Sequence, residues 1–414
     1  MRVALLDYAL PPERIAQKPP EAREGGRLLV VDPRAADDVA LQDEVVEDLP
    51  RLLPQGALLV VNDTRVLPAR LLAKKAETGG KVEIFLVRQE EPEPPAGEDG
   101  VLEHEPPPEG AEHWRALGKS SKPLRFEQDL EVGEDLVVRI LGRAEDDGLL
   151  RVRLSSPTGM PILKAIESYG HIPLPPYIKR ADEGDDAERY QTVFARNTGA
   201  VAAPTAGLHL SRALLGRLAI AGIELASVTL HVGLGTFQPV TAEDFDAHAM
   251  HEERVDVPRA AVEAIARAKR EGRPVIAVGT TVVRALEAAA REAERVGAHE
   301  LQPFHGATRL LLQPGERLRV VDALLTNFHL PKSTLLALVA TFLGVPNLHR
   351  VYRHAIDAEY RFYSYGDAML IRRALDPEAA KATVAVAEAA DAAETAARAQ
   401  ASAQADATPK PEAP

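Results

Sequence analysis

The sequence contains no cysteine among its 414 residues. This absence excludes a disulfide framework, a thiolate metal site and a cysteine nucleophile. Long apolar runs are missing too, since nothing approaches the roughly 20 uninterrupted apolar residues that span a bilayer. The first residues include Asp7 and show no small-residue cleavage site after an apolar run, so we expect no signal peptide. Together these absences favour a cytoplasmic protein with no membrane partner.

Several catalytic and cofactor motifs are also absent. There is no Walker-type phosphate loop and no Gly-x-Ser-x-Gly elbow of a serine hydrolase. The run from Gly233 to Gly235 lacks the third glycine of the dinucleotide fingerprint, which argues against a Rossmann cofactor. No helix carries His-Glu-x-x-His, and the histidines show no metal-ligand spacing. We therefore expect no bound metal.

Charge is unevenly distributed along the chain. The formal net charge of −13 disfavours a nucleic-acid partner at first sight, because phosphate contacts need Lys and Arg. Residues 89–113, however, contain nine acidic residues, six prolines and no Lys or Arg, a composition typical of a disordered, solvated loop. Between Arg65 and Lys81 there are five basic residues and one acid. The sequence is therefore compatible with a local RNA-binding surface.

Hydrophobic residues make up 45% of the chain, and their spacing indicates two kinds of domain. In residues 66–154 short runs alternate apolar and polar residues without intervening helices, which predicts a small antiparallel β-barrel. After Pro161 strand and helix patterns alternate, which predicts a parallel or mostly parallel sheet covered by helices. We expect residues 1–65 and 155–374 to form this α/β domain, with the barrel inserted, and residues 375–414 to form a disordered Ala-rich tail. The expected helices cover residues 209–221, 259–271, 280–296 and 333–343, and the expected strands of the α/β domain cover residues 26–32, 56–62, 199–203, 223–232, 274–278 and 317–325.

Four polar segments follow predicted strands of the α/β domain. They are Pro204–His209, Thr229–Thr236, Gly279–Thr281 and Thr326–Pro331. In open α/β sheets, ligands bind at the carboxyl ends of the strands. Four such segments on one edge therefore indicate a ligand site.

The chemistry of these segments leaves alternatives open. Gly279 permits a tight turn, and the helix that follows can direct free N–H groups at an anion, but a threonine N-cap explains the same residues more simply. His209, His231 and His329 lie in strand-end loops, where they suit acid–base work or hydrogen bonding to a ligand. Each of them is equally compatible with a partly buried structural ring.

Residues 170–180 form a proline-fixed loop that contains Tyr177, Lys179 and Arg180. A tyrosine beside two cations suits stacking on a base of single-stranded RNA. A surface turn with a packed tyrosine is the alternative.

Ten stretches, in this order along the chain, resemble a known family. They are Asp7–Gln17, Val61–Arg70 (VNDTRVLPAR), Gly170–Arg180 (GHIPLPPYIKR), Glu188–Phe194, Ala203–His209, Thr229–Pro239, His251–Glu253, Val278–Glu287, Leu325–Pro331 and Tyr363–Leu370. Over nearly all of residues 1–373 the chain resembles the S-adenosylmethionine:tRNA ribosyltransferase-isomerases of queuosine biosynthesis. The acidic insert and the Ala-rich tail lie outside the family pattern.

The resemblance implies a fold and a reaction. The implied fold is an α/β domain with an inserted β-barrel, in agreement with the patterns above. The implied enzyme is a transferase–isomerase that uses S-adenosylmethionine as cosubstrate and transfers its ribosyl part to 7-aminomethyl-7-deazaguanine at the tRNA wobble position. The tRNAs are those with a GUN anticodon (for Tyr, His, Asp and Asn), and the products are epoxyqueuosine-tRNA, adenine and methionine. We expect the enzyme to act as a monomer.

Loop position and residue chemistry then suggest roles. His209 and His231 are expected to transfer protons, with Glu253 as an orienting or basic partner. The methionine or ribose end of the cosubstrate is expected to bind Gly279, Thr280, Thr281, Arg284, Asn327 and His329. The tRNA is expected to contact Arg65, Arg70, Lys179, Arg180 and Lys332. Two other classes stay open: a tRNA methyltransferase, which would release S-adenosylhomocysteine, and an RNA-binding module without catalysis.

Overall fold

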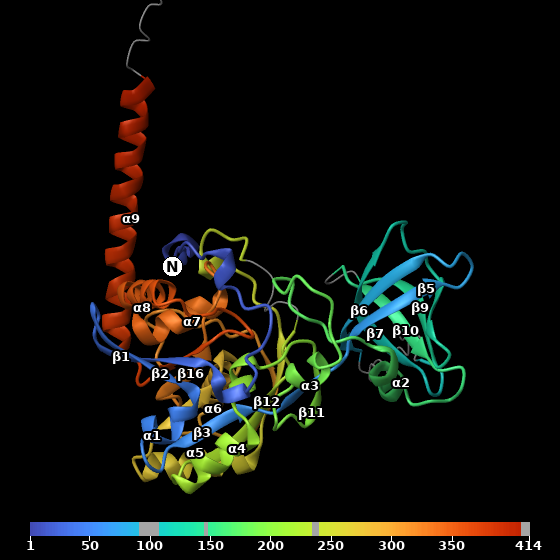
Figure 1. Cartoon of the computed structure of the whole chain (residues 1–414), viewed down its shortest axis with the longest axis horizontal. Coiled ribbons are helices and arrows are strands. Elements are labelled where there is room, and N and C mark those ends of the chain that lie inside the picture. Colours follow the sequence, from blue (N-terminus) through green and yellow to red (C-terminus); the bar gives the residue numbers. More distant parts are fainter. Residues whose placement is uncertain (91–106, 145–147, 234–239, 407–414) are drawn as a thin grey trace, which may run out of the picture. The chain divides into compact units, whose positions relative to one another are not determined.

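The computed structural model describes residues 1–90, 107–144, 148–233 and 240–406 (Figure 1). The chain divides into two compact units. The larger unit comprises Met1–Asn62, Thr205–Val228 and Gln238–Pro414, and the smaller comprises Asp63–Pro204 and Thr229–Phe237.

A nine-stranded mixed sheet forms the centre of the larger unit. Its strand order is β15-β13-β12-β3-β14-β16-β17-β1-β2. The strands are β1 (Arg27–Ala35), β2 (Asp38–Val45), β3 (Leu58–Asn62), β12 (Glu224–Leu230), β13 (Glu253–Val257), β14 (Val275–Val278), β15 (Phe304–Thr308), β16 (Ala323–Asn327) and β17 (Ala368–Ile371). The neighbours β12–β3, β3–β14 and β14–β16 are parallel, whereas β16–β17, β1–β2 and β13–β15 are antiparallel. Every residue of β3, β14 and β16 is buried, as expected of parallel strands covered on both faces.

Helices of the larger unit pack on this sheet. The α-helices are α1 (Leu49–Leu52), α4 (Arg212–Ile220), α5 (Arg259–Arg270), α6 (Thr280–Arg295), α7 (Thr334–Leu343), α8 (Val345–Asp357) and α9 (Pro377–Asp406), and the 3₁₀ turns include η1 (Val3–Leu6), η2 (Pro12–Arg14), η3 (Arg23–Gly25), η4 (Val46–Asp48), η5 (Thr205–His209) and η7 (Phe245–Ala247). Both α5 and α6 contact β3 and β14. Among the described residues no single helix is long and apolar enough to cross a membrane; only α7 and α8 taken together, with a bend of 109° between them, reach that length and composition.

The smaller unit contains a closed antiparallel barrel with strand order β10-β7-β6-β5-β8-β9. Its strands are β5 (Arg70–Lys75), β6 (Lys81–Gln89), β7 (Glu112–Ser120), β8 (Asp129–Gly133), β9 (Leu136–Arg143) and β10 (Leu150–Ser155). Alternate residues of each strand face a common apolar core, in which Ile84, Val138 and Val152 are fully buried. The unit also contains a parallel pair of short strands, β4 (Thr64–Val66) and β11 (Asn197–Ala200), and two short helices, α2 (Ile162–Tyr169) and α3 (Asp186–Arg189).

The predicted fold class, an α/β sheet with an antiparallel barrel, is confirmed. The sheet is mixed, with β12–β3, β3–β14, β14–β16 and β1–β17 parallel and β16–β17, β1–β2 and β13–β15 antiparallel. Two predicted strands differ from expectation. Of the strand expected at residues 199–203, only Gly199 and Ala200 belong to a strand, β11, which pairs with β4 in the smaller unit. The other is shorter than expected. Of residues 317–325, only those from Ala323 onward belong to β16. The backbone N–H groups of Arg319, Val320 and Val321 donate instead to the buried carboxylate of Glu287, so they are not available to a sheet ladder.

The C-terminal region differs from the expected disordered tail. Residues 377–406 form the long helix α9, which is consistent with the high helix propensity of alanine. Its first turns contact α7 and α8, and Ala380 and Thr383 are buried. The rest of the tail and residues 91–106 of the acidic insert lie outside the described residues.

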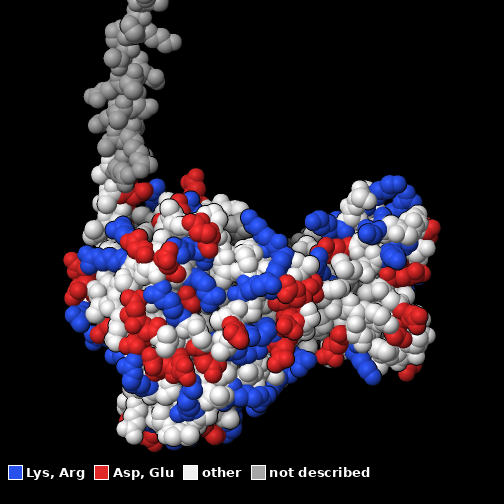
Figure 2. All heavy atoms as spheres, in the orientation of Figure 1, with Lys and Arg blue, Asp and Glu red and all other residues white. Residues whose placement is uncertain are grey.

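Acidic and basic side chains are intermixed on the face of the larger unit that Figure 2 shows. The net negative charge is therefore not spread evenly as one acidic surface, and local basic areas remain available.

Candidate active site

The carboxyl ends of β3, β14 and β16 lie side by side in the larger unit because these strands are adjacent and parallel. The side-chain amide of Asn62 donates to Thr281 Oγ1 at 3.2 Å. The backbone N–H of Gly279 donates to the carbonyl oxygen of Leu325 at 2.8 Å. Two of the predicted polar segments, 279–281 and 326–331, are therefore brought together at one sheet edge.

The turn between β14 and α6 is made by Gly279, which has φ +93° and is the N-cap residue of the helix. No side chain caps this helix, so the simple threonine N-cap is not what the structure contains. The first N–H groups of an α-helix have no acceptor within the helix, and they form a ready site for an anion. Thr280 is buried at this end and Thr281 is held by Asn62.

His209 ends the 3₁₀ turn η5 and is hydrogen-bonded to Asn327, the last residue of β16. The Asn327 Nδ2 group donates to the carbonyl oxygen of Tyr363 at 3.0 Å and lies 3.1 Å from His209 Nε2. Because the Tyr363 carbonyl can only accept, the NH₂ side of the amide faces both groups, and Nε2 of His209 is an acceptor. The proton of the neutral ring is then on Nδ1. Burial lowers the pKa of His209 to about 4, against a smaller raising effect of Asp367.

One buried acceptor of this cluster has no partner in the described part of the chain. Asn327 Oδ1 makes no hydrogen bond with any described residue, although Asn327 is buried. An unpaired acceptor of this kind costs free energy, which a ligand N–H or O–H group would recover.

Gly26 leaves space beside His209. A Cβ at this position would lie 3.5 Å from Asp367 Oδ1 and 3.6 Å from His209 Nδ1. The Asp367 carboxylate is fixed by backbone N–H groups of Arg27, at 3.1 Å, and Arg361, at 2.7 Å. A neutral ring nitrogen and a fixed carboxylate thus flank one small open position.

His329 lies in an aromatic environment two residues after β16. Its Nε2 atom is 3.0 Å from Thr326 Oγ1, and its backbone N–H donates to the Tyr352 hydroxyl oxygen at 3.0 Å. The Tyr8 hydroxyl donates to the His329 carbonyl oxygen, and the Phe328 and Tyr352 rings are 5.6 Å apart. Burial lowers the pKa of His329 to about 3, so the ring is neutral and acts here as a hydrogen-bonding group.

Glu253, at the start of β13, forms a buried ion pair with Arg284 of α6. Arg284 Nε also donates to the carbonyl oxygen of Leu310 at 3.0 Å. Its Nη2 atom is buried and has no hydrogen-bond partner among the residues that the structure describes. The carboxylate expected to assist a histidine is therefore in contact with the arginine expected to bind the cosubstrate. This arrangement fixes a guanidinium group that still has an unused N–H donor.

His231 belongs to the smaller unit. Its Nδ1 atom lies 2.8 Å from Thr64 Oγ1, and a Cβ at Gly199 would be only 2.8 Å from the ring. The lack of a side chain at Gly199 thus permits the ring to lie against the backbone of β11.

Asp63 is a polar residue whose role was not predicted from the sequence. Its Oδ1 atom accepts from the Thr229 hydroxyl at 2.7 Å and from Asn197 Nδ2 at 3.1 Å. It stands between Asn62, the last residue of β3, and Thr64, and the four residues of β3 before Asn62 are all apolar. Gly279 was selected as a candidate because it follows an apolar strand, and the same criterion could have identified residues 62–64.

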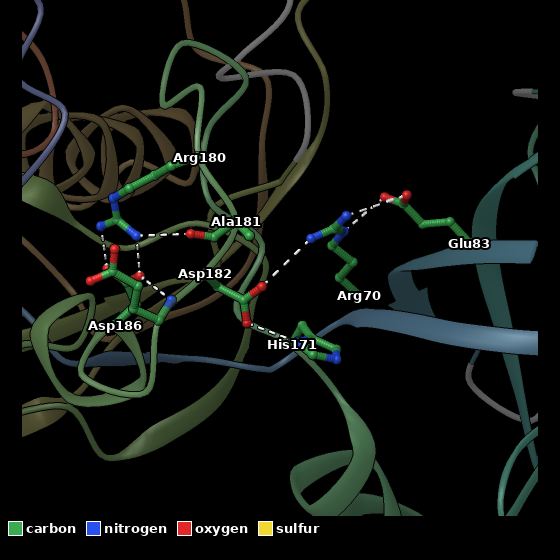
Figure 3. A network of polar contacts seen from close by, with 8 residues as sticks. Arg70, Glu83, His171, Arg180, Ala181, Asp182 and Asp186 are labelled. Atoms are coloured by element: carbon green, nitrogen blue, oxygen red, sulfur yellow. Dashed lines mark hydrogen bonds and ion pairs between the residues drawn. The ribbon is translucent and has the colours of Figure 1, made fainter.

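Two of the five residues expected to contact tRNA are held by carboxylates (Figure 3). Arg70 donates to Glu83 at 2.8 Å and lies 3.6 Å from Asp182, which is in turn 2.9 Å from His171 Nδ1. Arg180 donates to both oxygens of Asp186, at 2.6 and 2.8 Å. Within the smaller unit, these ion pairs link residues 170–180 and β5 to Glu83 of β6 and to Asp182 and Asp186.

The other three are more exposed. Lys179 is exposed, and the Arg65 side chain is 50% exposed with Glu167 at 4.0 Å. Lys332, in the larger unit, is 50% exposed and forms an ion pair with Asp7 at 2.7 Å. In the described parts of the chain no group of three or more His, Cys, Asp or Glu side chains is arranged to hold a metal ion.

Comparison with known proteins identifies the family. A family model described as queuosine biosynthesis protein matches residues 3–371. The chain belongs to this family of queuosine biosynthesis proteins and is an enzyme of the transferase–isomerase class. It is 57% identical to the S-adenosylmethionine:tRNA ribosyltransferase-isomerase of Sorangium cellulosum, over 90% of this chain and 99% of that protein. The enzyme of the same name from Magnetococcus marinus is 48% identical, over 91% of this chain and 96% of its own length. A solved structure, S-adenosylmethionine tRNA ribosyltransferase from Thermotoga maritima, is 32% identical, covers 89% of this chain and 99% of its own, and has a TM-score of 0.47. The family resemblance seen in the sequence is thus confirmed.

Proposed function

We propose that this enzyme transfers the ribosyl part of S-adenosylmethionine to 7-aminomethyl-7-deazaguanine at the wobble position of tRNAs with a GUN anticodon. The products would be epoxyqueuosine-tRNA, adenine and methionine. The observation that carries the proposal is the 57% identity to a ribosyltransferase-isomerase over 99% of that protein's length. We place the reaction in the cytoplasm and expect a monomer.

The reaction makes three demands on the residues of the site. The sulfonium group acidifies the adjacent 5′ carbon, so a base has to take a proton there. Adenine leaves more easily when it is protonated or receives a hydrogen bond, and the aminomethyl nitrogen has to attack as a neutral amine. Neutral histidines are suited to such proton transfers at ordinary pH.

We assign His209 the role of a hydrogen-bond donor in this scheme. Its Nε2 lone pair is directed at the Asn327 amide, 3.1 Å away, which leaves Nδ1–H on the side of Gly26. His231, which is bonded to Thr64, then remains the candidate for the base. Substitution of each histidine tests the assignment, because near-normal turnover in both variants would contradict it.

We assign the charged end of the cosubstrate to the β14–α6 turn. The unpaired Nη2 group of Arg284 and the free N–H groups at the start of α6 suit the methionine carboxylate. Glu253 acts on this group indirectly, by fixing Arg284. Gly279, Thr280 and Thr281 form this turn and the start of α6. The Asn327 Oδ1 atom, which has no partner among the described residues, suits a ribose hydroxyl, together with His329 two residues later.

For the tRNA, exposure favours Arg65 and Lys332, whose side chains are each 50% exposed, and the exposed Lys179. Arg70 and Arg180 are 32% and 18% exposed and are therefore less accessible.

The experiment is incubation of the enzyme with S-adenosylmethionine and tRNA carrying the aminomethyl-deazaguanine base, followed by chromatography of the small molecules. Adenine and methionine released together, with added mass on the tRNA, are expected. Release of S-adenosylhomocysteine would indicate methyl transfer instead. Binding of tRNA without consumption of the cosubstrate would indicate an RNA-binding module.

A further inference from the structure

One end of the barrel in the smaller unit presents a group of basic side chains next to an exposed aromatic ring. Lys74 of β5 and Lys81 of β6 are directly opposite each other in the strand ladder. The loop after β7 adds further cations. We call this surface the basic end of the barrel, and it consists of Lys74, Lys81, Lys119, Lys122, Arg125 and Phe126. Figure 2 shows Lys and Arg side chains gathered at one end of the barrel.

The loop of residues 121–126 is held in place beside β5. The ammonium group of the buried Lys75 donates to the backbone carbonyls of Lys122, at 3.4 Å, and Pro123, at 3.3 Å. Leu124 packs on the barrel core, since a Cβ at Gly118 would lie only 2.7 Å from Leu124 Cδ1. The cations of the loop are therefore positioned near those of the β5–β6 hairpin.

These cations form no ion pair within the described part of the protein, although Glu83 stands opposite Lys119 in the ladder of β6 and β7. No ion pair with a described residue is formed by Lys74, Lys81, Lys119, Lys122 or Arg125. Elsewhere on the barrel, Arg139 is paired with Asp129 and Arg151 with Glu90. Glu131 stands opposite Lys74 in the ladder with β8 but does not form an ion pair with it. Like charges directly opposite each other across two strands are destabilising. A bound anion would relieve this repulsion.

Phe126 is 69% exposed. A phenylalanine next to unpaired cations on a positively charged surface is the combination with which proteins bind single-stranded nucleic acid, because bases stack on the ring while cations contact the backbone. The pairing of Arg70 and Arg180 with carboxylates removes two other cations of the same unit from this role.

We propose that the basic end of the barrel is a tRNA-binding surface, in which the five cations contact phosphates and Phe126 stacks on an unpaired base. This proposal rests on the proposed function, because it takes tRNA to be the substrate. It adds a contact surface that belongs to the smaller unit.

The test measures the dissociation constant for tRNA between about 50 and 200 mM salt, where phosphate contacts show most clearly. The variants are Lys81→Gln with Lys122→Gln, and Phe126→Ser alone. The matched control is Arg212→Gln with Arg270→Gln, which removes two exposed cations of the larger unit.

Each phosphate contact contributes roughly 0.7 to 0.9 to the slope of log K against log salt. The lysine double variant should therefore lower the slope by about 1.5, and the control should leave it unchanged. Phe126→Ser should weaken binding about 5- to 100-fold with little change of slope, because stacking is largely independent of salt. Slopes and affinities equal to wild type in both barrel variants would overturn the proposal.

Adenine release by the same proteins separates this inference from the proposed function. If wild type binds tRNA but releases no adenine, the proposed function fails, and the binding series still decides on the surface. A raised KM for tRNA with unchanged kcat in the barrel variants supports the surface; a reduced kcat with unchanged KM contradicts it. Binding to phosphatidylserine vesicles through these residues, without an effect on tRNA, would also contradict it.

Discussion

Replacing the buried His209 with glutamine should remove part of the protein's sensitivity to mild acid. Burial lowers the pKa of His209 to about 4, whereas a histidine in an unfolded chain has a pKa of about 6.5. The difference of about 2.5 units corresponds to about 3 kcal/mol of stability, since each unit is worth about 1.4 kcal/mol.

Whether stability rises or falls with pH depends on which state, folded or unfolded, binds the proton first as the pH falls. Because the folded-state pKa is the lower one, the unfolded chain takes up a proton first as the pH falls. The contribution of His209 to the free energy of unfolding is therefore complete above about pH 6.5 and is lost progressively as the pH falls toward 4. Between pH 8 and pH 5 the loss from this histidine should be about 2 kcal/mol.

The assay is urea unfolding, followed by circular dichroism, at pH 8 and pH 5. A glutamine can still accept the hydrogen bond of Asn327, so the variant is expected to fold. Its stability should fall by about 2 kcal/mol less than that of wild type between the two pH values. His305→Gln is the control, because the His305 side chain is 91% exposed and its replacement removes a histidine without changing a buried site. Equal losses in wild type and His209→Gln would refute the reasoning.

Three further substitutions test other parts of the larger unit. Gly26→Ala should fold normally, since the added Cβ would make only ordinary contacts at 3.5 and 3.6 Å, but it should reduce adenine release. The control Gly25→Ala, whose Cβ would lie 3.6 Å from Ala22, should leave adenine release unchanged. Equal activity of the two variants would show that the position beside Gly26 is not used. Glu253→Ala should cost about 3–5 kcal/mol in urea unfolding because it leaves the Arg284 guanidinium buried without its partner, and Glu253→Leu with Arg284→Met should cost less than the two single changes together. Glu287→Ala should lower the free energy of unfolding by about 3 kcal/mol or more, since three backbone N–H groups lose their acceptor. Glu287→Gln should lower it less, because the amide oxygen still accepts a hydrogen bond. Equal losses in thermal unfolding would contradict this account.

Local periodicity by itself determined much of the fold. The apolar runs at β3 and β14 are nearly continuous, and alternating residues mark the barrel strands, so strand type and barrel class could be predicted. The helices α5, α6 and α7 begin and end within one residue or so of their expected bounds, because an amphipathic or apolar helical pattern is a property of neighbouring residues. The edge that carries the polar segments was also predictable, since parallel strands direct their carboxyl ends to one side.

Pairings between distant residues were decided only by the tertiary structure. His209 meets Asn327 across 118 residues, and the short strands β13 and β17, which were not predicted, exist because partners far along the chain complete their ladders. Glu287 withdraws the N–H groups of residues 319–321 from a predicted strand, an interaction that no local pattern indicates.

The chemical state of the candidate residues likewise depends on the folded structure. The sequence alone gave His209 and His329 as titratable groups, and burial makes both neutral by lowering their pKa values to about 4 and about 3. The sequence also indicated cations at Arg70 and Arg180, and their ion pairs in the folded unit remove them as obvious RNA contacts. Residue type is local, but solvation and charge partners depend on contacts between distant segments, which is why only the tertiary structure decided them.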